Sequence, residues 1–548
     1  MRIVVSPARL AAWAALFTLL VPVYPAAGQD TPTRRVLILG FDGVEPTIVD
    51  TMLEKGELPN LAALRDQGGY DRLATTQPPQ SPVAWASFST SKQPGEHGVF
   101  DFMTRNTHDM STRPGFGYTK HIAFAPDGRV SQMPSFETNR SGSTFWMVAD
   151  AQGVRTKVLY VPFMTPPDPL VHGAEICGLG VTDIRQSSSF SFNLSDRYEN
   201  RAPSAGGLLI PLEFHGDIAD ASIPAYPAYM PTAGPRGKYP PFVEMPIRVV
   251  ADRGEHSVKV FAANQEFELK EGEWSRWFES EHMITTHLTV HAISRFNLVE
   301  AGNHVNLYMT SFQMHPEHPY IPFTSPGNYS AELAKRYGLY KTVGWAYDTH
   351  AVRKDRLPED AFLEDIRTSM AWREKFTLDE IDAGNFELLI SVWTATDRVA
   401  HLFWRFRDED HLLYTPAGAE KYGTAVEDTY RKMDEIVGKT MARLSENDLL
   451  LVLSDHGFGN YHYGFSVNTW LVRNGYAWVK GQRNAETAYG SRGGYLRDFD
   501  WLRTQAYSIG LSSLYLNVRG RERTGIVRPD RIEALAKEIR AKLLDVVC

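Results

Sequence analysis

The stretch "RRVLILGFDG", residues 34 to 43, decides the fold of this chain. Its side chains are apolar at every position from Val36 to Leu39, and the run ends on Asp42 and Gly43. A short, continuous apolar run that stops at Asp-Gly predicts a β-strand buried on both faces. Such strands are typical of parallel sheets, because helices cover both faces of those sheets.

Three further runs repeat this pattern along the chain. They are "TKVLYVP" (156–162), "FELLISVW" (386–393) and "NDLLLVLSDHG" (447–457), and they alternate with stretches of helical spacing such as "LPNLAALRDQG". Strands that alternate with helices predict an α/β fold with a mostly parallel central sheet.

The composition changes between residues 173 and 315, where segments such as "SVKVFAA" and "HLTVHAISRF" have strand-type sequences. A chain of 548 residues also exceeds the roughly 250–300 residues that a single core supports. We therefore expect a discontinuous α/β core, residues 29–172 and 316–548, interrupted by a β-rich insertion or cap at 173–315.

Overall charge restricts the class of partner. The formal net charge is −8, with 57 Lys and Arg against 65 Asp and Glu. Proteins that hold nucleic-acid polymers neutralise phosphates with a broad basic surface, which this composition does not supply. We expect no nucleic-acid polymer as a partner. The expected ligand is a small phosphate-containing substrate, which would need a local positive centre to bind. The sequence does not indicate an oligomeric state.

The first 28 residues have the features of a secretory signal peptide. Arg2 and Arg9 precede an apolar run over residues 10–23, and small residues follow at 26–28. A membrane anchor is the alternative, but the run is shorter than the roughly 20 residues of a span and contains Pro22. We expect a periplasmic or secreted protein without a stable membrane span after cleavage.

Three of the predicted strands end on residues that can bind a metal. Asp42 follows the first strand, Asp397 and His401 follow the strand that begins near Leu388, and Asp455 and His456 follow the last. The carboxyl ends of parallel strands meet at one edge of a sheet, where α/β proteins bind ligands. Asp and His together suit zinc or a related metal. Each pattern alone also has a structural explanation as a turn, a cap or a weakly stabilising helix pair.

A candidate nucleophile lies in "QPPQSPVAWASFSTSKQPGEHGVFDF". Ser81 followed by Pro82 predicts a helix start, with Ser81 at the N-cap. Capping alone would explain this serine. The amides of a first helical turn also attract anions, however, so a serine in this place suits a phosphate site.

Four of these segments, taken in order, carry a family resemblance: "VLILGFDG", "SPVAWASFSTSKQPGEHGVFDF", "TDRVAHLFWR" and "LVLSDHGFG". Together they resemble the type I phosphodiesterase/nucleotide pyrophosphatase family of the alkaline phosphatase superfamily. The resemblance implies an alkaline-phosphatase-like three-layer sandwich and a phosphohydrolase with two divalent metals, expected to be zinc. It implies that one metal is held by Asp42, Ser81, Asp455 and His456, and the other by Asp397 and His401.

The chain departs from the family pattern in two places. Ala84 stands where nucleotide pyrophosphatases have a phosphate-binding Asn three positions after the nucleophile, so selectivity for nucleotides does not follow. The family also has a third histidine for the second metal, well downstream. The sequence ends at "ALAKEIRAKLLDVVC", which we interpret as a truncated C-terminus, and His462 is the nearest substitute. We expect weak occupancy of that second site. His97 and the pair His315 and His318 are interpreted as structural or loop residues.

We expect an exported, metal-dependent phosphohydrolase that cleaves phosphodiester or phosphoanhydride bonds through in-line attack by Ser81. A sulfatase is disfavoured, because "SPVAW" lacks the Ser/Cys-x-Pro-x-Arg pattern of that class. Two alternatives remain: a phosphomonoesterase or phosphomutase of the same superfamily, and a non-catalytic or weakly active binding protein that lacks a complete second metal site.

Overall fold

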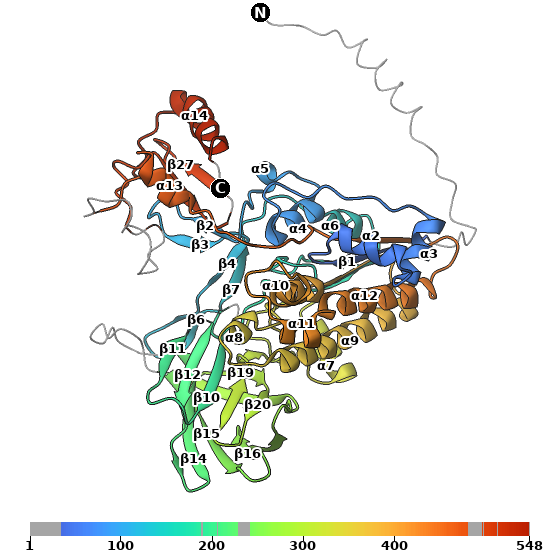
Figure 1. Cartoon of the computed structure of the whole chain (residues 1–548), viewed down its shortest axis with the longest axis vertical. Coiled ribbons are helices and arrows are strands. Elements are labelled where there is room, and N and C mark those ends of the chain that lie inside the picture. The colour runs from blue at the N-terminus through green and yellow to red at the C-terminus, as the bar shows by residue number, and fades with distance from the viewer. Residues whose placement is uncertain are drawn as a thin grey trace, which may run out of the picture. The chain divides into compact units, whose positions relative to one another are not determined.

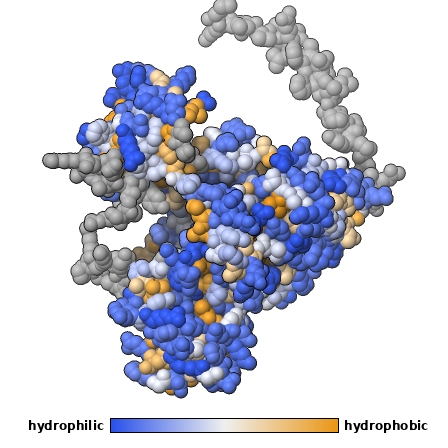
Figure 2. Space-filling view, viewed as in Figure 1, coloured by the Kyte–Doolittle hydropathy of each residue, from blue (hydrophilic) through white to orange (hydrophobic). Residues whose placement is uncertain are grey.

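The computed structural model describes residues 34–187, 190–204, 206–227, 242–480, 496, 498–511 and 513–546. The predicted signal peptide, residues 1–28, lies outside the described residues. No helix in the described ranges is long and apolar enough to cross a membrane, and the face drawn in Figure 2 is mostly hydrophilic.

The fold is mixed α/β and is organised around a six-stranded sheet of order β23-β9-β8-β24-β1-β25. The strands are β1 (Val36–Phe41), β8 (Thr156–Leu159), β9 (Ala174–Ile176), β23 (Thr324–Ser325), β24 (Leu388–Trp393) and β25 (Leu449–Leu453). All neighbours pair in parallel except β23, which is antiparallel to β9. The prediction of a mostly parallel sheet is therefore confirmed, and the four apolar runs form β1, β8, β24 and β25.

Helices lie between these strands, and two more, α13 and α14, follow β25. Their bounds are α2 (Pro46–Glu54), α3 (Pro59–Gln67), α4 (Ser81–Thr90), α5 (Pro94–His97), α6 (Phe145–Asp150), α7 (Tyr329–Tyr337), α8 (Thr349–Arg353), α9 (Glu359–Ala383), α10 (Ala395–Arg407), α11 (Pro416–Tyr422), α12 (Ala425–Met441), α13 (Val467–Arg473) and α14 (Ile532–Leu544).

Strand β1 is buried on both faces, which explains its continuous apolar sequence. Leu39 and Phe41 belong to a core cluster with side chains of α2, α9, α10 and α12, whereas Ile38 packs with Trp85 of α4 and Trp146 of α6. Figure 1 shows α4 and α6 on one side of β1 and α9, α10 and α12 on the other. Gly40 permits the close approach of α4, because a Cβ atom there would lie 2.6 Å from the Trp85 ring.

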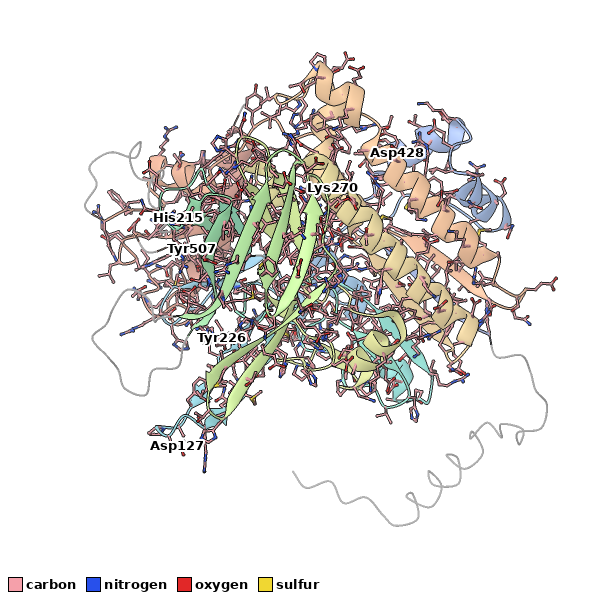
Figure 3. All side chains as sticks on the ribbon, turned by 90° about the horizontal axis from the view of Figure 1, so that it is seen from below. Asp127, His215, Tyr226, Lys270, Asp428 and Tyr507 are labelled. Carbon is pink, nitrogen blue, oxygen red and sulfur yellow. The ribbon has the colours of Figure 1, made fainter. Side chains whose placement is uncertain are left out.

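The segment between β9 and β23 folds into three further sheets. One five-stranded sheet contains β10 (Ser191–Ser195), β11 (Ala202–Ser204), β12 (Gly207–Pro211), β20 (Phe296–Glu300) and β21 (Asn306–Met309); a second contains β13 (Phe214–His215), β14 (Ile218–Pro227), β15 (Phe242–Asp252), β16 (Ser257–Ala262) and β17 (Gln265–Lys270); a three-stranded sheet contains β18 (Phe278–Thr285), β19 (Leu288–Ser294) and β22 (Gln313–Met314). Tyr226 and Lys270, labelled in Figure 3, lie on the second of these sheets. Strand β9 falls inside the range 173–315 that the sequence assigns to an insertion, yet it pairs with β8 in the six-stranded sheet.

Short two-stranded pairs complete the described chain. They are β2 (Met103–Arg105) with β3 (Thr112–Pro114), β4 (Gly117–Lys120) with β7 (Ser135–Thr138), β5 (Ala123–Phe124) with β6 (Val130–Gln132), and β26 (Ala506–Ile509) with β27 (Ser513–Leu516).

Candidate metal and nucleophile site

Strand β1 delivers Asp42 to the carboxyl edge of the six-stranded sheet. The backbone N–H of Asp42 donates to the carbonyl of Trp393 on β24, at 2.9 Å, so the parallel ladder continues to this residue. The side chain is buried, and its two oxygens accept hydrogen bonds from Ser81 Oγ at 3.3 Å and from Trp85 Nε1 at 3.1 Å. Asp42 is thus fixed by two donors from one helix.

Ser81 is the first helical residue of α4. The sequence predicts it instead as the N-cap residue, just before the helix. Gln80, not Ser81, is the N-cap residue, and it has an extended backbone. The prediction that Ser81 caps the helix is therefore wrong. Its hydroxyl instead contacts Asp42 and His456. Ser81 Oγ lies 3.3 Å from Asp42 Oδ1 and 3.1 Å from Nε2 of His456.

Asp397 and His401 lie in the first two turns of α10, which begins directly after β24. His401 Nε2 is 3.5 Å from Asp397 Oδ1, as expected for residues four positions apart on a helix. Asp397 is buried, whereas 42% of the His401 side chain is exposed. The His401 ring also packs edge-on against Phe458, with centroids 5.0 Å apart.

Asp455 and His456 follow β25 on the other side of β1. The backbone N–H of Gly43 donates to Asp455 Oδ1 at 3.2 Å, and His456 Nε2 lies 3.4 Å from Asp455 Oδ2. The other ring nitrogen of His456, Nδ1, bonds the carbonyl of Gly457 at 2.7 Å. That bond assigns a proton to Nδ1 and directs Nε2 toward the carboxylates.

The six residues proposed from the sequence are therefore connected at one edge of the sheet. The Asp42–Ser81–His456 contacts join β1, α4 and the end of β25, and Asp397 offers an oxygen within 4.8 Å of ligand atoms of both Asp42 and His456. His401 joins the group through Asp397.

The electrostatics of this cluster reflect three buried carboxylates. Burial first, and then the charges of Asp455 and Asp397, raise the pKa of Asp42 well above its ordinary value. Burial is also the main reason that the pKa of Asp455 is raised. For His456, burial acts to lower the pKa, but the three carboxylates outweigh it and raise the pKa to about 9. A negative site of this kind attracts a cation.

The donor set fits a divalent metal ion. Asp42, Asp397 and His456 present ligand atoms that all lie within 4.8 Å of one another, and Asp and His are ligands that zinc and related metals accept. The Oδ2 atom of Asp455 is buried without a hydrogen-bond partner among the described residues. A buried acceptor is normally satisfied, and only Nε2 of His456 lies near this oxygen, at 3.4 Å, so the Asp455 carboxylate can also accept a cation.

Several residues that support this site were not predicted from the sequence. Trp85 donates to Asp42, and the hydroxyl of Thr396 donates to the Asp42 backbone carbonyl at 2.5 Å. The position of Trp85 four residues after Ser81 was the available signal, since residues at that spacing share a helix face. Arg398 supplies a local positive charge, with Nε 3.5 Å from Asp397 Oδ2.

The other singled-out residues lie outside this cluster. His462 is exposed and its ring contacts that of Tyr463, so the third ligand of a second metal is not identified. His97 is buried, bonds Ser87 Oγ through Nε2 at 3.0 Å and accepts from the Val99 N–H through Nδ1, and burial lowers its pKa. Ala84 is buried within α4.

An aromatic pocket of about 400 Å³ is linked to this site. Its walls come from the loops after β8 and β9, from the β2–β7 region and from the segment between α7 and α8. They include Phe102, Phe116, Tyr118, Phe163, Leu179 and Trp345. Two contacts connect it with the cluster. The Phe102 N–H bonds the side chain of Gln80, next to Ser81, and the Trp345 ring lies 3.9 Å from the guanidinium carbon of Arg398.

The sequence model of the family described as type I phosphodiesterase / nucleotide pyrophosphatase matches residues 36–213 and 260–547. Comparison with curated proteins and with solved structures gave no match. The matched ranges contain all six residues of the cluster and leave out residues 214–259, of which the described residues form β13 to β15 and the start of β16. The match spans most of the chain, and the chain therefore belongs to the type I phosphodiesterase / nucleotide pyrophosphatase family of the alkaline phosphatase superfamily.

Proposed function

We propose that this protein is a metal-dependent phosphodiesterase in which Ser81 is the nucleophile. The observation that carries the proposal is the position of Ser81 Oγ, 3.3 Å from Asp42 and 3.1 Å from His456 at the first residue of α4. Family membership supports a phosphodiesterase or pyrophosphatase hydrolase, and the packing of helices on both faces of the sheet supports the three-layer arrangement of the superfamily.

Each residue has a distinct part in the proposed reaction. Asp42 accepts the Ser81 hydrogen bond and orients the hydroxyl, while Trp85 and the ladder bond to Trp393 hold Asp42 in place. The positive end of the α4 dipole, equivalent to about half a unit charge, favours the phosphate beside Ser81. His456, with Nδ1 bonded to Gly457, directs Nε2 toward Ser81 and the carboxylates.

Divalent metal ions held by Asp42, Asp455, His456 and Ser81, and by Asp397 with His401, would polarise the phosphoryl oxygens and lower the pKa of the Ser81 hydroxyl. The short contacts and the unpaired Asp455 oxygen support the first ligand set. For the second set, Asp397 and His401 supply two protein ligands, fewer than the three that are typical of catalytic zinc.

The aromatic pocket favours a diester over a monoester substrate. Strands lie about 4.8 Å apart, so loops after β8 and β9 are about 10–15 Å from the end of β1, within reach of a substituent on the phosphate. The residues that line the pocket include no Asp, Glu, Lys or Arg. We therefore propose that it accepts an uncharged, planar ester group rather than a second phosphate. Phosphodiesters should accordingly be better substrates than phosphoanhydrides.

Turnover of two aryl phosphates tests this function. The metal-loaded full chain should hydrolyse bis(4-nitrophenyl) phosphate with a higher kcat/KM than 4-nitrophenyl phosphate, and chelation should abolish both activities. A preference for the monoester would favour the phosphomonoesterase or phosphomutase alternative. Absence of turnover with metal bound would favour the non-catalytic alternative. Export remains a prediction from residues 1–28.

A further inference from the structure

The three-stranded sheet β18-β19-β22 brings two histidines and a glutamate into one row. Glu281 of β18 is paired directly with His291 of β19. Ala292 is paired with Met314, so His315 is the next residue opposite His291, and its N–H donates to the His291 carbonyl at 3.4 Å. Backbone pairing therefore sets these neighbours side by side, whatever torsions their side chains adopt.

A turn adds a third imidazole to this row. The sequence "HPEHP" places His318 three residues after His315, and the His318 N–H bonds the His315 carbonyl at 3.2 Å. The ring centroids of His291 and His318 are 4.8 Å apart, those of His315 and His318 are 5.3 Å apart, and those of His291 and His315 are 6.3 Å apart. Imidazoles on one tetrahedral zinc have centroids about 5 Å apart, because Zn–N bonds are about 2.0–2.1 Å long.

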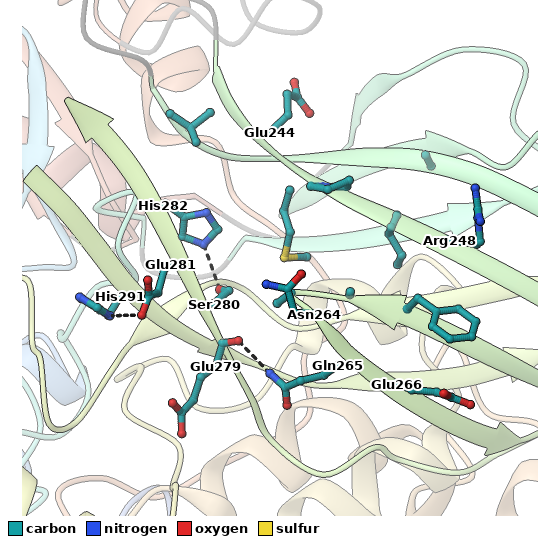
Figure 4. Close-up of a pocket in the computed structure, with 18 of the residues that line it drawn as sticks. Glu244, Arg248, Asn264, Gln265, Glu266, Glu279, Ser280, Glu281, His282 and His291 are labelled. Atoms are coloured by element: carbon teal, nitrogen blue, oxygen red, sulfur yellow. Dashed lines mark hydrogen bonds and ion pairs between the residues drawn. The ribbon is translucent and has the colours of Figure 1, made fainter. Parts of the chain in front are cut away.

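Two carboxylates lie close to ring nitrogens of these histidines. Glu281 Oε1 is 3.7 Å from Nδ1 of His291, and Glu279 Oε2 is 3.5 Å from Nε2 of His315. Figure 4 shows the Glu281–His291 contact in the cavity that these residues line. These contacts are ion pairs, and a carboxylate on one side of a ring leaves the other nitrogen for a metal, as around many zinc-bound histidines.

We propose that His291, His315 and His318 form a binding site for a divalent transition-metal ion such as Zn²⁺, separate from the Ser81 site. None of the three belongs to the six-stranded sheet. Three imidazoles with an open fourth position are a known coordination set for zinc. The sequence-based interpretation of His315 and His318 as structural residues did not include His291, which is distant in sequence and joins them only through the ladder.

Binding requires rotation of the side chains. Among the described residues only Asp42, Asp397 and His456 already present ligand atoms within 4.8 Å of one another. In the histidine cluster, Nδ1 of His315 accepts from the Glu317 N–H at 3.1 Å, so the metal takes the place of that donor. His318 is exposed, and 30% of the His291 side chain is exposed.

Metal stoichiometry of the full chain, prepared without a polyhistidine tag, tests the proposal. The probe is Zn²⁺ by titration calorimetry, with Co²⁺ absorption as a second readout of tetrahedral nitrogen ligands. The parent for these measurements carries Asp42→Asn and His456→Gln, so that the Ser81 site is disabled. We expect one Zn²⁺ per chain in this parent, and at least tenfold weaker binding after His318→Gln.

The matched control is His287→Gln, because His287 is an exposed histidine in the turn between β18 and β19. It should leave the stoichiometry unchanged, and Glu281→Gln should weaken binding without abolishing it. In the otherwise unchanged protein, His318→Gln should lower the metal count by one and leave diester turnover intact, so the result does not depend on the proposed activity. Equal binding by the His318→Gln and His287→Gln chains, or no Zn²⁺ binding by the parent, overturns the site. If the parent does not fold, the metal count of the otherwise unchanged protein decides.

Discussion

Gly43 is held against the side chain of Asp397. A Cβ atom at position 43 would lie 2.8 Å from the Cβ of Asp397 and 2.9 Å from its Oδ1, and Gly43 has a φ of +69°. The same glycine donates its N–H to Asp455. The Asp-Gly pair that ends β1 therefore serves the site twice. Asp42 supplies a carboxylate, and Gly43 leaves the space that Asp397 occupies while it donates its N–H to Asp455.

Gly43→Ala should therefore damage both folding and metal binding. Positive φ costs an alanine about 1–2 kcal/mol, and the contact with Asp397 adds an overpacking term of about 1–3 kcal/mol. Gly56→Ala is the matched control, since Gly56 has a φ of +72° but a Cβ atom there would meet no other atom within 4 Å. Thermal unfolding and metal content should show a stability loss in both variants and a metal loss only in Gly43→Ala. Equal metal content in the two would contradict this interpretation of Gly43.

The sequence predicted the central sheet because the strands β1, β8 and β24 are continuous apolar runs that are largely buried. The edge strand β25 has the same apolar sequence but is only partly buried. The apolar runs of β1, β8, β24 and β25 carry that information locally. Strand β9 was missed as part of this sheet, because three residues, "AEI", give no periodic signal and include the buried Glu175. Its place depends on pairing with β8 on one side and β23 on the other, which are contacts between distant residues.

The candidate site was predictable where ligands follow strands directly. Asp42, Asp455 and His456 follow their strands closely, and Asp397 lies in the first turn of the helix after β24, so parallel pairing brings these positions together. The helix register at Ser81 was off by one residue, because an N-cap serine and a serine held by Asp42 and His456 have the same sequence signature. The aromatic pocket had no signal, since its walls come from loops that meet only in the folded chain.

Ser81→Ala should remove the nucleophile. We expect kcat for an aryl phosphodiester to fall by at least about 10³-fold, the scale seen when a catalytic serine is deleted. Ser87→Ala is the control from the same helix; Ser87 Oγ contacts His97 at 3.0 Å and not the carboxylates. Steady-state kinetics should show near-normal turnover for Ser87→Ala. If Ser81→Ala retained comparable turnover, another group would have to be the nucleophile.

Trp85→Phe should affect activity through Asp42. The change removes the 3.1 Å bond from Nε1 to Asp42 Oδ2, leaving a buried oxygen unpaired at about 1–3 kcal/mol. Trp146→Phe is the matched control, because Trp146 lies in the same apolar cluster and its Nε1 donates to the buried Asp168 at 2.8 Å. Both variants should unfold at lower temperature, but only Trp85→Phe should lower kcat and shift its pH profile. Identical kinetics for the two would mean that Trp85 has only a packing role.

Phe116→Ala tests the aromatic pocket. The Phe116 ring lies 4.7 Å from that of Phe163 and has no described contact with the carboxylates, so metal content should not change. We expect kcat/KM for bis(4-nitrophenyl) phosphate to fall several-fold more than that for 4-nitrophenyl phosphate, because only the diester retains an aryl group beside the attacked phosphorus. An equal fall for both substrates would indicate that the pocket holds the leaving group instead.

The metal-free protein should lose stability as the pH rises, and added metal should reverse that loss. The folded-state pKa of His456 is about 9, above its ordinary 6.5, so its stabilising contribution is complete below pH 6.5 and is lost as the pH passes through 9. The raised pKa of Asp42 acts in the same direction.

Metal binding displaces the His456 proton, so affinity should increase by up to about tenfold per pH unit between 6.5 and 8.5. The rise in Tm on adding Zn²⁺ should accordingly be larger at pH 8.5 than at pH 6.5. Calorimetric titration in two buffers of different ionisation enthalpy measures the released proton directly, and His456→Gln, which cannot release it, is the control. Affinity independent of pH over this range would show that His456 is already neutral before the metal binds.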